Sequence, residues 1–157
     1  MDRQLLSKIL AQMRDYLKEG KPFGDLKVSA LLALGSQLEA IFYYLGHELG
    51  TILKVDQVKE VSKIPEALKK VIAEYNIGEM SILETSKEIV QLQLKGHSSI
   101  RDLVGIGIDS PSNFSSFEAG LLAGIVEKMS NIHCFAQELS SNLEEGQCEF
   151  MIVYQRE

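Results

Sequence analysis

The chain has 157 residues, of which 45% are hydrophobic and 24% are charged, and its 16 basic and 22 acidic side chains give a net charge of −6. This length and composition are typical of one globular domain, residues 1–157, that buries its own core, and they exclude intrinsic disorder. The acidic balance excludes nucleic-acid binding through phosphate contacts, and the longest apolar stretches fall well short of the roughly 20 residues that span a bilayer.

The first half of the sequence predicts helices. Apolar residues recur at helical spacing over residues 4–18, and Gly20 and Pro22 end this run. A second apolar series advances in steps of three and four from Leu34 to Ile52, and it predicts a central helix about five turns long.

Helical spacing returns over residues 56–75, but Pro65 interrupts it. Because proline cannot donate a backbone hydrogen bond to the preceding turn, we expect a short helix that ends near Lys63 and a second helix from Pro65 to Tyr75.

After Gly78 the spacing of the apolar residues changes from helical to alternating. Residues 90–95 alternate as a half-buried antiparallel strand does, and residues 80–83 are its expected hairpin partner, joined near Ser86. Residues 96–114 are rich in Gly and Ser and predict a long loop, a kind of connection that is often functional.

The last third of the chain predicts a helix and a second hairpin. The helix covers about residues 116–129, and the strands cover about 132–139 and 147–155 around a turn at 140–146. The order of helices, hairpin, helix and hairpin indicates an α+β domain, in which an antiparallel sheet of about four strands is covered by helices.

Two pairs of glycines lie four residues apart on predicted helices: Gly46 with Gly50, and Gly120 with Gly124. Residues at this spacing share a helix face, so each pair makes a flat strip that another backbone or a flat ligand can approach. Close packing between elements is the simpler interpretation, and ligand contact is compatible with it if the helices form the wall of a cavity.

The sequence contains no catalytic or cofactor motif. The segment 105–107 resembles the start of a dinucleotide-binding fingerprint, but Ser110 occupies the position of the third glycine. The three histidines, His47, His97 and His133, are scattered and do not have metal-binding spacing. We therefore expect no cofactor and no enzymatic activity.

A capping box begins the helix of the last third. Ser115 is placed to accept a hydrogen bond from the backbone of the third helical residue, while Glu118 reaches back to the backbone of Ser115. This structural role explains Glu118 without a catalytic function.

Two cysteines are too few for a disulfide framework, and with no secretion signal in sight they indicate a reducing, cytoplasmic setting. Glu138 is expected roughly opposite Cys148 in the last hairpin, which makes these two residues weak candidates for a metal site. Cys134 cannot join them, because four residues of strand cover about 13 Å. The alternative is that both cysteines are small buried hydrophobic residues.

Three segments near the C-terminus, 116–125, 134–138 and 146–150, resemble the vinyl-4-reductase domain family. In that pattern a helix with paired glycines leads into a strand that carries Glu, and a turn with Gly precedes a strand that begins Cys-x-Phe. The central helix around 45–50 is consistent with the family's earlier glycine-containing helix. The resemblance implies a compact α+β domain, usually dimeric, that binds a ligand in an apolar pocket between helices and sheet.

The related proteins include sensor domains of aromatic-responsive bacterial transcription activators and vesicle-tethering subunits. Sensor-type members hold a structural zinc ion through one Glu and three Cys. Here Glu138 and Cys148 match that pattern, whereas Ser141 stands at one Cys position and Ser115 or Ser116 at another. Because hydroxyl groups are poor zinc ligands, we expect no zinc site, or one that binds weakly.

The first functional hypothesis is non-enzymatic binding of an apolar or aromatic small molecule by a sensor or carrier. The residues expected to line the pocket are Phe42, Tyr43, Leu45, His47, Val104, Phe117 and Leu121. Such pockets are mostly apolar with a few polar anchors. The anchor could be Tyr43, Tyr44, His47 or Arg101. One alternative is a homodimeric protein-interaction module without a ligand, and another is an accessory component of a reductase.

Overall fold

The structure is a computed structural model that describes residues 38–104 and 114–155, together with 10–11, 14–15, 17–20, 27 and 30. Its elements are, in chain order, α3 (Glu39–Ile52), the 3-10 helix η2 (Val61–Lys63), α4 (Ile64–Glu74), β1 (Glu79–Thr85), β2 (Ile89–Lys95), α5 (Ser116–Ser130), β3 (Cys134–Asn142) and β4 (Gln147–Tyr154). Six residues of the predicted helix over 4–18 are described, and they are helical. Residues 105–113 of the predicted loop lie outside the described part.

The four strands form one antiparallel sheet in the order β1-β2-β4-β3, which confirms the predicted α+β fold and both hairpins. The first hairpin turns at Ser86, whose hydroxyl accepts hydrogen bonds from the backbone N–H groups of Glu88 and Ile89, each at 3.1 Å. Alternation along the strands buries one face of the sheet. Val90, Leu92 and Leu94 of β2 are at most 1% exposed.

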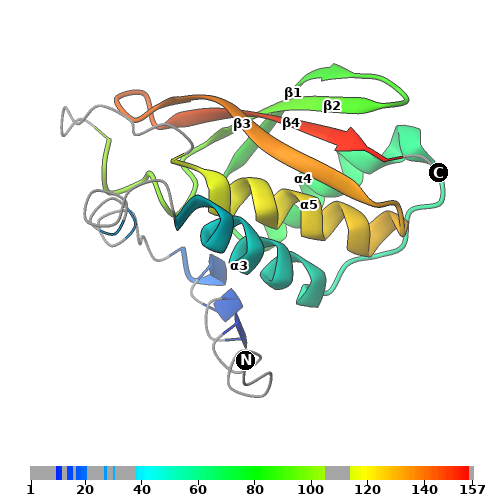
Figure 1. Ribbon diagram of the computed structural model, residues 1–157, viewed down its shortest axis with the longest axis horizontal. Coiled ribbons are helices and arrows are strands. Elements are labelled where there is room, and N and C mark those ends of the chain that lie inside the picture. The colour runs from blue at the N-terminus through cyan, green and yellow to red at the C-terminus, as the bar shows by residue number, and fades with distance from the viewer. Residues whose placement is uncertain are drawn as a thin grey trace.

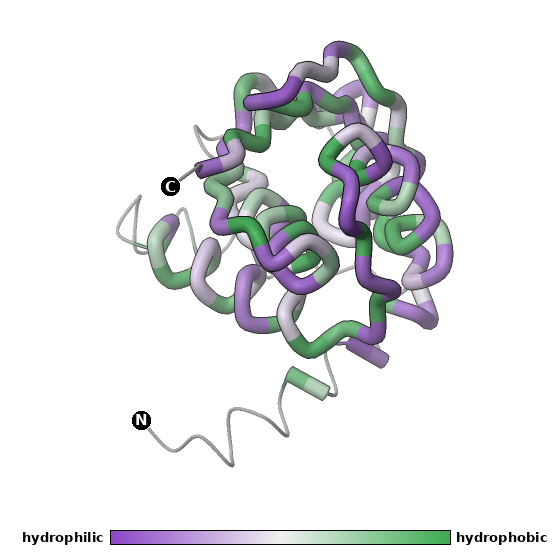
Figure 2. Tube along the Cα trace, turned by 90° about the vertical axis from the view of Figure 1, so that its right-hand side faces the viewer, coloured by the Kyte–Doolittle hydropathy of each residue, from purple (hydrophilic) through white to green (hydrophobic). Residues whose placement is uncertain are grey.

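The helices lie on one side of the sheet (Figure 1). Helices α4 and α5 pack against the sheet, and α3 packs against α5 on the side away from it. Hydrophobic and hydrophilic residues alternate along the strands in Figure 2, as expected for a sheet that is covered on one face only. Within the described ranges, no helix is long and apolar enough to cross a membrane.

The prediction of a short helix that ends near Lys63 is wrong. Residues 54–60 are extended, and only the 3-10 turn Val61–Lys63 precedes α4. The reason is tertiary: the N–H of Val58 donates to the carbonyl of Met129 at 2.7 Å, and the side-chain amide of Gln57 donates to the carbonyl of Lys128 at 2.7 Å. These bonds satisfy carbonyls at the end of α5 that a helix leaves without a partner.

Other boundaries differ by a few residues. The central helix α3 begins at Glu39, and residues 34–37 of the prediction lie outside the described part. Strand β3 runs on to Asn142, with an irregularity between Glu138 and Ser140, so the second turn is shorter than the predicted 140–146. Gly146, which has φ of +67°, completes this turn in the left-handed conformation that glycine adopts without strain.

Candidate functional site

The paired glycines form the contact between α3 and α5. A Cβ atom added to Gly46, Gly50, Gly120 or Gly124 would lie less than 3.0 Å from backbone atoms of the facing helix. The two helices therefore touch backbone to backbone, and overpacking at these positions is destabilising. This confirms close packing as the role of the glycines, because the strips face each other and leave no room for a ligand on them.

The residues predicted to line a pocket lie mostly around this contact. Phe42, Tyr43 and Leu45 of α3 are half-buried against the core, and Phe117 and Leu121 of α5 are at most 2% exposed. The backbones of Phe117 and Leu121 lie directly against α3.

Val104 lies apart from the other predicted pocket residues. Its side chain is 48% exposed and contacts the turn at Gly146. Of the polar anchors, Arg101 donates to the carbonyls of Gly20, Asn76 and Gly96, so its guanidinium ties loops together. Tyr44 is 44% exposed on the outer side of α3.

Tyr43 and His47 have structural partners at the edge of the sheet. The Tyr43 hydroxyl accepts the backbone N–H of Ala136 at 3.2 Å, and burial raises the pKa of this tyrosine. Glu127 accepts the N–H of Cys134 at 3.0 Å and lies 3.0 Å from Nε2 of His47. Side chains of α3 and α5 thus cover the outer edge of β3, which protects it from pairing with other strands.

Glu127 also lies 3.5 Å from Nδ1 of His133, whose side chain is 81% exposed. Partial burial alone would raise the pKa of Glu127, but the Cys134 N–H and then His47 lower it below its usual value. The carboxylate is therefore ionised and joins the end of α5 to α3 and to the start of β3.

Glu118 is not part of a capping box. Ser115 makes no side-chain cap to α5, and Glu118 is 1% exposed inside the protein. Its carboxylate lies 2.5 Å from Nζ of Lys27 and accepts a hydrogen bond from the hydroxyl of Ser99, while Nδ1 of His97 is 3.4 Å away. Burial alone would raise the pKa of Glu118, but Lys27 and then His97 hold it well below its usual value. Lys27 and Glu118 thus form a buried ion pair, and with Ser99 and His97 they make up a buried polar cluster.

This polar cluster continues to Cys148. Nε2 of His97 is 3.3 Å from its sulfur, and the hydroxyl of Ser115 is 3.1 Å from it. Burial raises the pKa of the Cys148 thiol to about 12, so the sulfur stays protonated at neutral pH. Cys148, His97 and Glu118 lie in the order of a thiol, imidazole and carboxylate, as they do around a catalytic cysteine. The Cys148 side chain is, however, 1% exposed and its thiol is protonated, so it is not activated as a nucleophile.

The expected pairing of Glu138 with Cys148 is wrong. Glu138 pairs with Phe150, whereas Cys148 pairs with Ser141, because β3 continues to Asn142 and the turn before β4 is shorter than predicted. Glu138 instead accepts the backbone N–H of Ser115 at 2.5 Å and so caps the first turn of α5 from a neighbouring strand.

Ser115 thus contacts both Glu138 and Cys148, and Ser141 lies opposite Cys148. The resemblance sets Glu138, Cys148, Ser141 and either Ser115 or Ser116 against the four-residue zinc pattern, so serine stands at two of its cysteine positions. Among the described residues, no three His, Cys, Asp or Glu side chains are placed to hold a metal ion.

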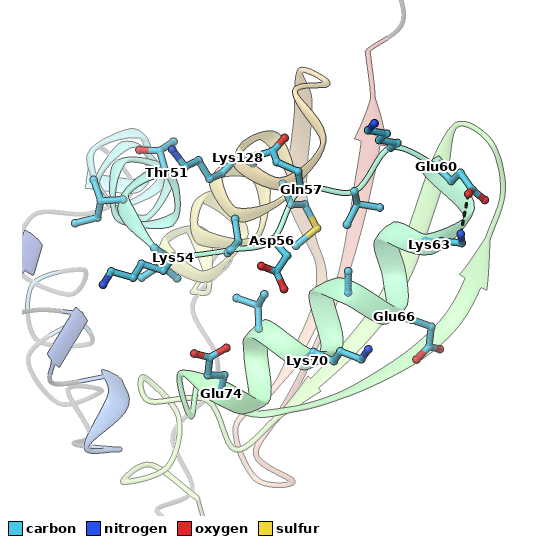
Figure 3. A pocket seen from close by; sticks show the side chains of 18 residues that line it. Thr51, Lys54, Asp56, Gln57, Glu60, Lys63, Glu66, Lys70, Glu74 and Lys128 are labelled. Atoms are coloured by element: carbon cyan, nitrogen blue, oxygen red, sulfur yellow. Dashed lines mark hydrogen bonds and ion pairs between the residues drawn. The ribbon is translucent and has the colours of Figure 1, made fainter.

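A groove of about 1330 Å³ opens at the other end of the helices (Figure 3). Its walls are α4 and the extended segment 53–60, which passes the end of α5. Except for Ile52, which is exposed, the apolar lining residues are buried or half-buried, and the charged ones are exposed, so the groove has an apolar floor and a charged rim. The floor consists of Leu53, Val55, Val58, Ala67, Val71 and Met129, and the rim carries five lysines and four acidic residues.

Sequence reasoning missed both the polar cluster and the groove. Lys27 and Glu118 are 91 residues apart, and nothing local marks them as partners. None of the seven predicted pocket residues lines the groove. The available signal for the cluster was the run His97, Ser98 and Ser99 directly after a strand, because polar groups that follow a buried strand are often drawn into the interior by hydrogen bonds.

No protein-family model matches the sequence, and no curated protein matches it. Solved structures share the fold. A vinyl-4-reductase family protein from Methanocaldococcus jannaschii is 18% identical with a TM-score of 0.58, covering 99% of this chain and 98% of its own. The phenol-responsive sensory domain of the transcription activator PoxR, solved with phenol, is 10% identical with a TM-score of 0.64, covering 83% of this chain and 72% of its own.

A trafficking protein particle complex subunit 3 from Naegleria fowleri, covalently bound to palmitic acid, is 13% identical with a TM-score of 0.49, covering 98% of this chain and 92% of its own. The first two structures define the class: this chain has the α+β fold of vinyl-4-reductase family proteins and of a phenol-responsive sensory domain. The resemblance predicted from residues 116–125, 134–138 and 146–150 is confirmed at the level of the fold.

Proposed function

We propose that this protein binds an apolar or aromatic small molecule, as a sensor or carrier, and performs no chemistry on it. The observation that carries the proposal is the shared fold with a sensory domain that was solved with phenol. Ligand-binding sites are mostly apolar with a few polar groups, and the described residues offer two places of this kind.

The first place is the flank of the α3–α5 contact, beside predicted residues of these two helices; Val104 is not part of it. Phe42 and Leu45 are half-buried there, so they remain partly open to a ligand. Phe117 and Leu121 supply buried apolar surface on the facing helix. The second place is the groove, whose apolar floor is open to solvent. We propose the α3–α5 flank as the binding site and treat the groove as the competing location.

The absence of catalysis is supported by the state of the two thiols. Cys134 and Cys148 are free and buried, and burial raises the pKa of each to about 12. A thiol must lose its proton to act as a nucleophile. The same two free thiols support the proposal of a cytoplasmic location, where cysteines stay reduced.

Two experiments test the proposal. The first is a calorimetric titration of the protein with phenol, and the second is native mass spectrometry of the protein purified from its own host. We expect saturable phenol binding or a retained apolar compound. Phe42→Asp should weaken phenol binding about tenfold or more, because it places a charge in an apolar site. The control Leu83→Asp, on an exposed apolar residue of β1, should leave it unchanged.

Loss of binding in Val58→Asp, with Phe42→Asp unaffected, would move the site to the groove. The proposal is contradicted if the protein does not bind phenol and also retains no compound from its host.

We also propose that the protein forms a homodimer. The observation that favours a protein–protein contact is the exposure of large apolar side chains on α3, where Ile41 is 53% and Tyr44 is 44% exposed. Exposed apolar surface of this kind marks interaction sites when it is contiguous. Analytical ultracentrifugation tests this proposal independently of the ligand.

A further inference from the structure

Two of the three histidines of the chain meet at one carboxylate. Nε2 of His47 lies 3.0 Å from Oε2 of Glu127, and Nδ1 of His133 lies 3.5 Å from Oε1 of the same side chain. His47 belongs to α3, Glu127 to α5, and His133 is the residue before β3. The fold therefore brings together three side chains that can bind a metal ion, although His47 and Glu127 are 80 residues apart in the sequence.

The spacing of the donor atoms fits a metal site. Two imidazoles and one carboxylate are a donor set that binds zinc and similar transition-metal ions. Metal–ligand bonds of about 2.0–2.2 Å leave neighbouring ligand atoms about 2.9–3.4 Å apart. The separation of His47 from Glu127 falls in this range, and that of His133 lies just beyond it.

The carboxylate is already oriented by the protein. Oε1 of Glu127 accepts the backbone N–H of Cys134 at 3.0 Å, and the side chain of Glu127 is 20% exposed. Hydrogen bonds of this kind hold carboxylate ligands in place in metal sites. The Glu127 carboxylate is also ionised, which is the state that a metal ion requires.

The two histidines differ in their freedom to move. The side chain of His133 is 81% exposed, whereas that of His47 is 25% exposed. As these described side chains lie, the three donors do not converge on one point. Because the His133 side chain is exposed, its ring can change rotamer at little cost and close on an ion that His47 and Glu127 hold.

We infer that His47, Glu127 and His133 form a binding site for a divalent transition-metal ion of the zinc class. His47 and Glu127 provide the preformed part of the site, and the ring of His133 turns to complete it. Water fills the remaining coordination position, as in other zinc sites with three protein ligands. The net charge of −6 favours the approach of a cation. The bound ion joins α3, the end of α5 and the start of β3.

This histidine site is distinct from the weak metal candidates Glu138 and Cys148. Those two residues contact Ser115, directly before α5, whereas Glu127 lies 12 residues further along, or about 18 Å in a helix. The inference also goes beyond the proposed function, because an ion at Glu127 does not depend on the binding of an apolar molecule.

Calorimetric titration of the full chain with zinc chloride, after dialysis against a chelator, tests the inference. We expect one saturable zinc ion per chain. His133→Ala should weaken zinc binding about tenfold or more, because it removes one of three ligands, and this exposed position should tolerate the change. Glu127→Gln should weaken binding at least as much. The matched control Glu144→Gln, on an exposed carboxylate of the last turn, should leave the affinity unchanged.

Nuclear magnetic resonance of the histidine rings identifies the ligands without any substitution. Zinc should shift the ring nitrogen signals of His47 and His133. The signals of His97, which is 0% exposed in the polar cluster, should stay where they are. Cys148→Ser should bind zinc as wild type does, because Cys148 belongs to the other candidate site.

Three results would overturn the inference. The first is a protein that binds no zinc in the calorimetric titration. The second is zinc binding that Cys148→Ser abolishes and His133→Ala does not, or that shifts the signals of His97. The third is a shift of His133 alone, which would show an ion held at one exposed ring. The phenol titration is independent of all three results.

Discussion

Replacing Lys27 by Met tests whether the buried carboxylate of Glu118 depends on its counter-charge. The two side chains are 3% and 2% exposed, and Nζ lies 2.5 Å from the carboxylate. Lys27→Met keeps the approximate length of the side chain and, among the described residues, leaves Glu118 with Ser99 and His97 as partners. Removing one partner of a buried ion pair costs about 3–5 kcal/mol, because the other charge stays in the interior without compensation. We expect a loss of this size in the free energy of unfolding.

Urea unfolding followed by circular dichroism at neutral pH measures this loss. The double variant Lys27→Met/Glu118→Leu, which removes both charges, should recover most of the stability, because an apolar pair of similar volume replaces the ion pair. The matched surface control is Lys63→Met, which breaks the exposed contact between Lys63 and Glu60. It should cost no more than about 0.5 kcal/mol.

The pH dependence provides a second readout. The pKa of Glu118 is lower in the folded protein than in the unfolded chain, where it is about 4.3. The ion pair therefore stabilises the protein fully above that value, and its contribution is lost as the pH falls below it, at up to about 1.4 kcal/mol per pH unit. In Lys27→Met this acid loss should be smaller. The reasoning is refuted if the free energy of unfolding of Lys27→Met stays within about 1 kcal/mol of wild type and falls with decreasing pH as it does in wild type.

Three further expectations follow from the packing. Gly120→Ala should cost about 1–3 kcal/mol in a thermal melt, because its Cβ would clash with the backbone carbonyl of Tyr43. Tyr43→Phe should cost about 1 kcal/mol, because it removes the acceptor for the Ala136 N–H at the edge of β3; an unchanged melting temperature would contradict that role. Cys148 should resist iodoacetamide at pH 8 in the folded protein and react readily in urea, since its pKa of about 12 leaves almost no thiolate; rapid labelling of the folded protein would show that the site opens.

Much of the fold could be predicted because it depends on local spacing. Alternation along 90–95 and along the last strand predicted both hairpins, and helical spacing predicted α3, α4 and α5. The glycine pairs predicted close packing between elements, and the structure shows that the pairs on α3 and α5 pack against each other. The C-terminal motifs predicted the fold class for the same reason: each motif is contained in one short segment.

Tertiary contacts decided the rest. Residues 54–60 have helical spacing but are extended, because their hydrogen-bonding groups pair with the end of α5. Glu118 has the spacing of a capping residue, yet it turns inward to a lysine 91 residues away. The extension of β3 to Asn142 places Glu138 opposite Phe150 rather than Cys148, and its carboxylate accepts the N–H of Ser115 at the start of α5.

Sequence by itself therefore determined most of the helices and strands that the structure describes, because burial on one face imposes a period on each segment. Only the tertiary structure decided where its polar side chains find their partners. A carboxylate or a backbone group is stabilised by whichever donor lies nearest in space once the core has formed. For Glu118 and Glu138 the donor comes from a distant part of the chain, and for the segment that borders the groove the acceptor does.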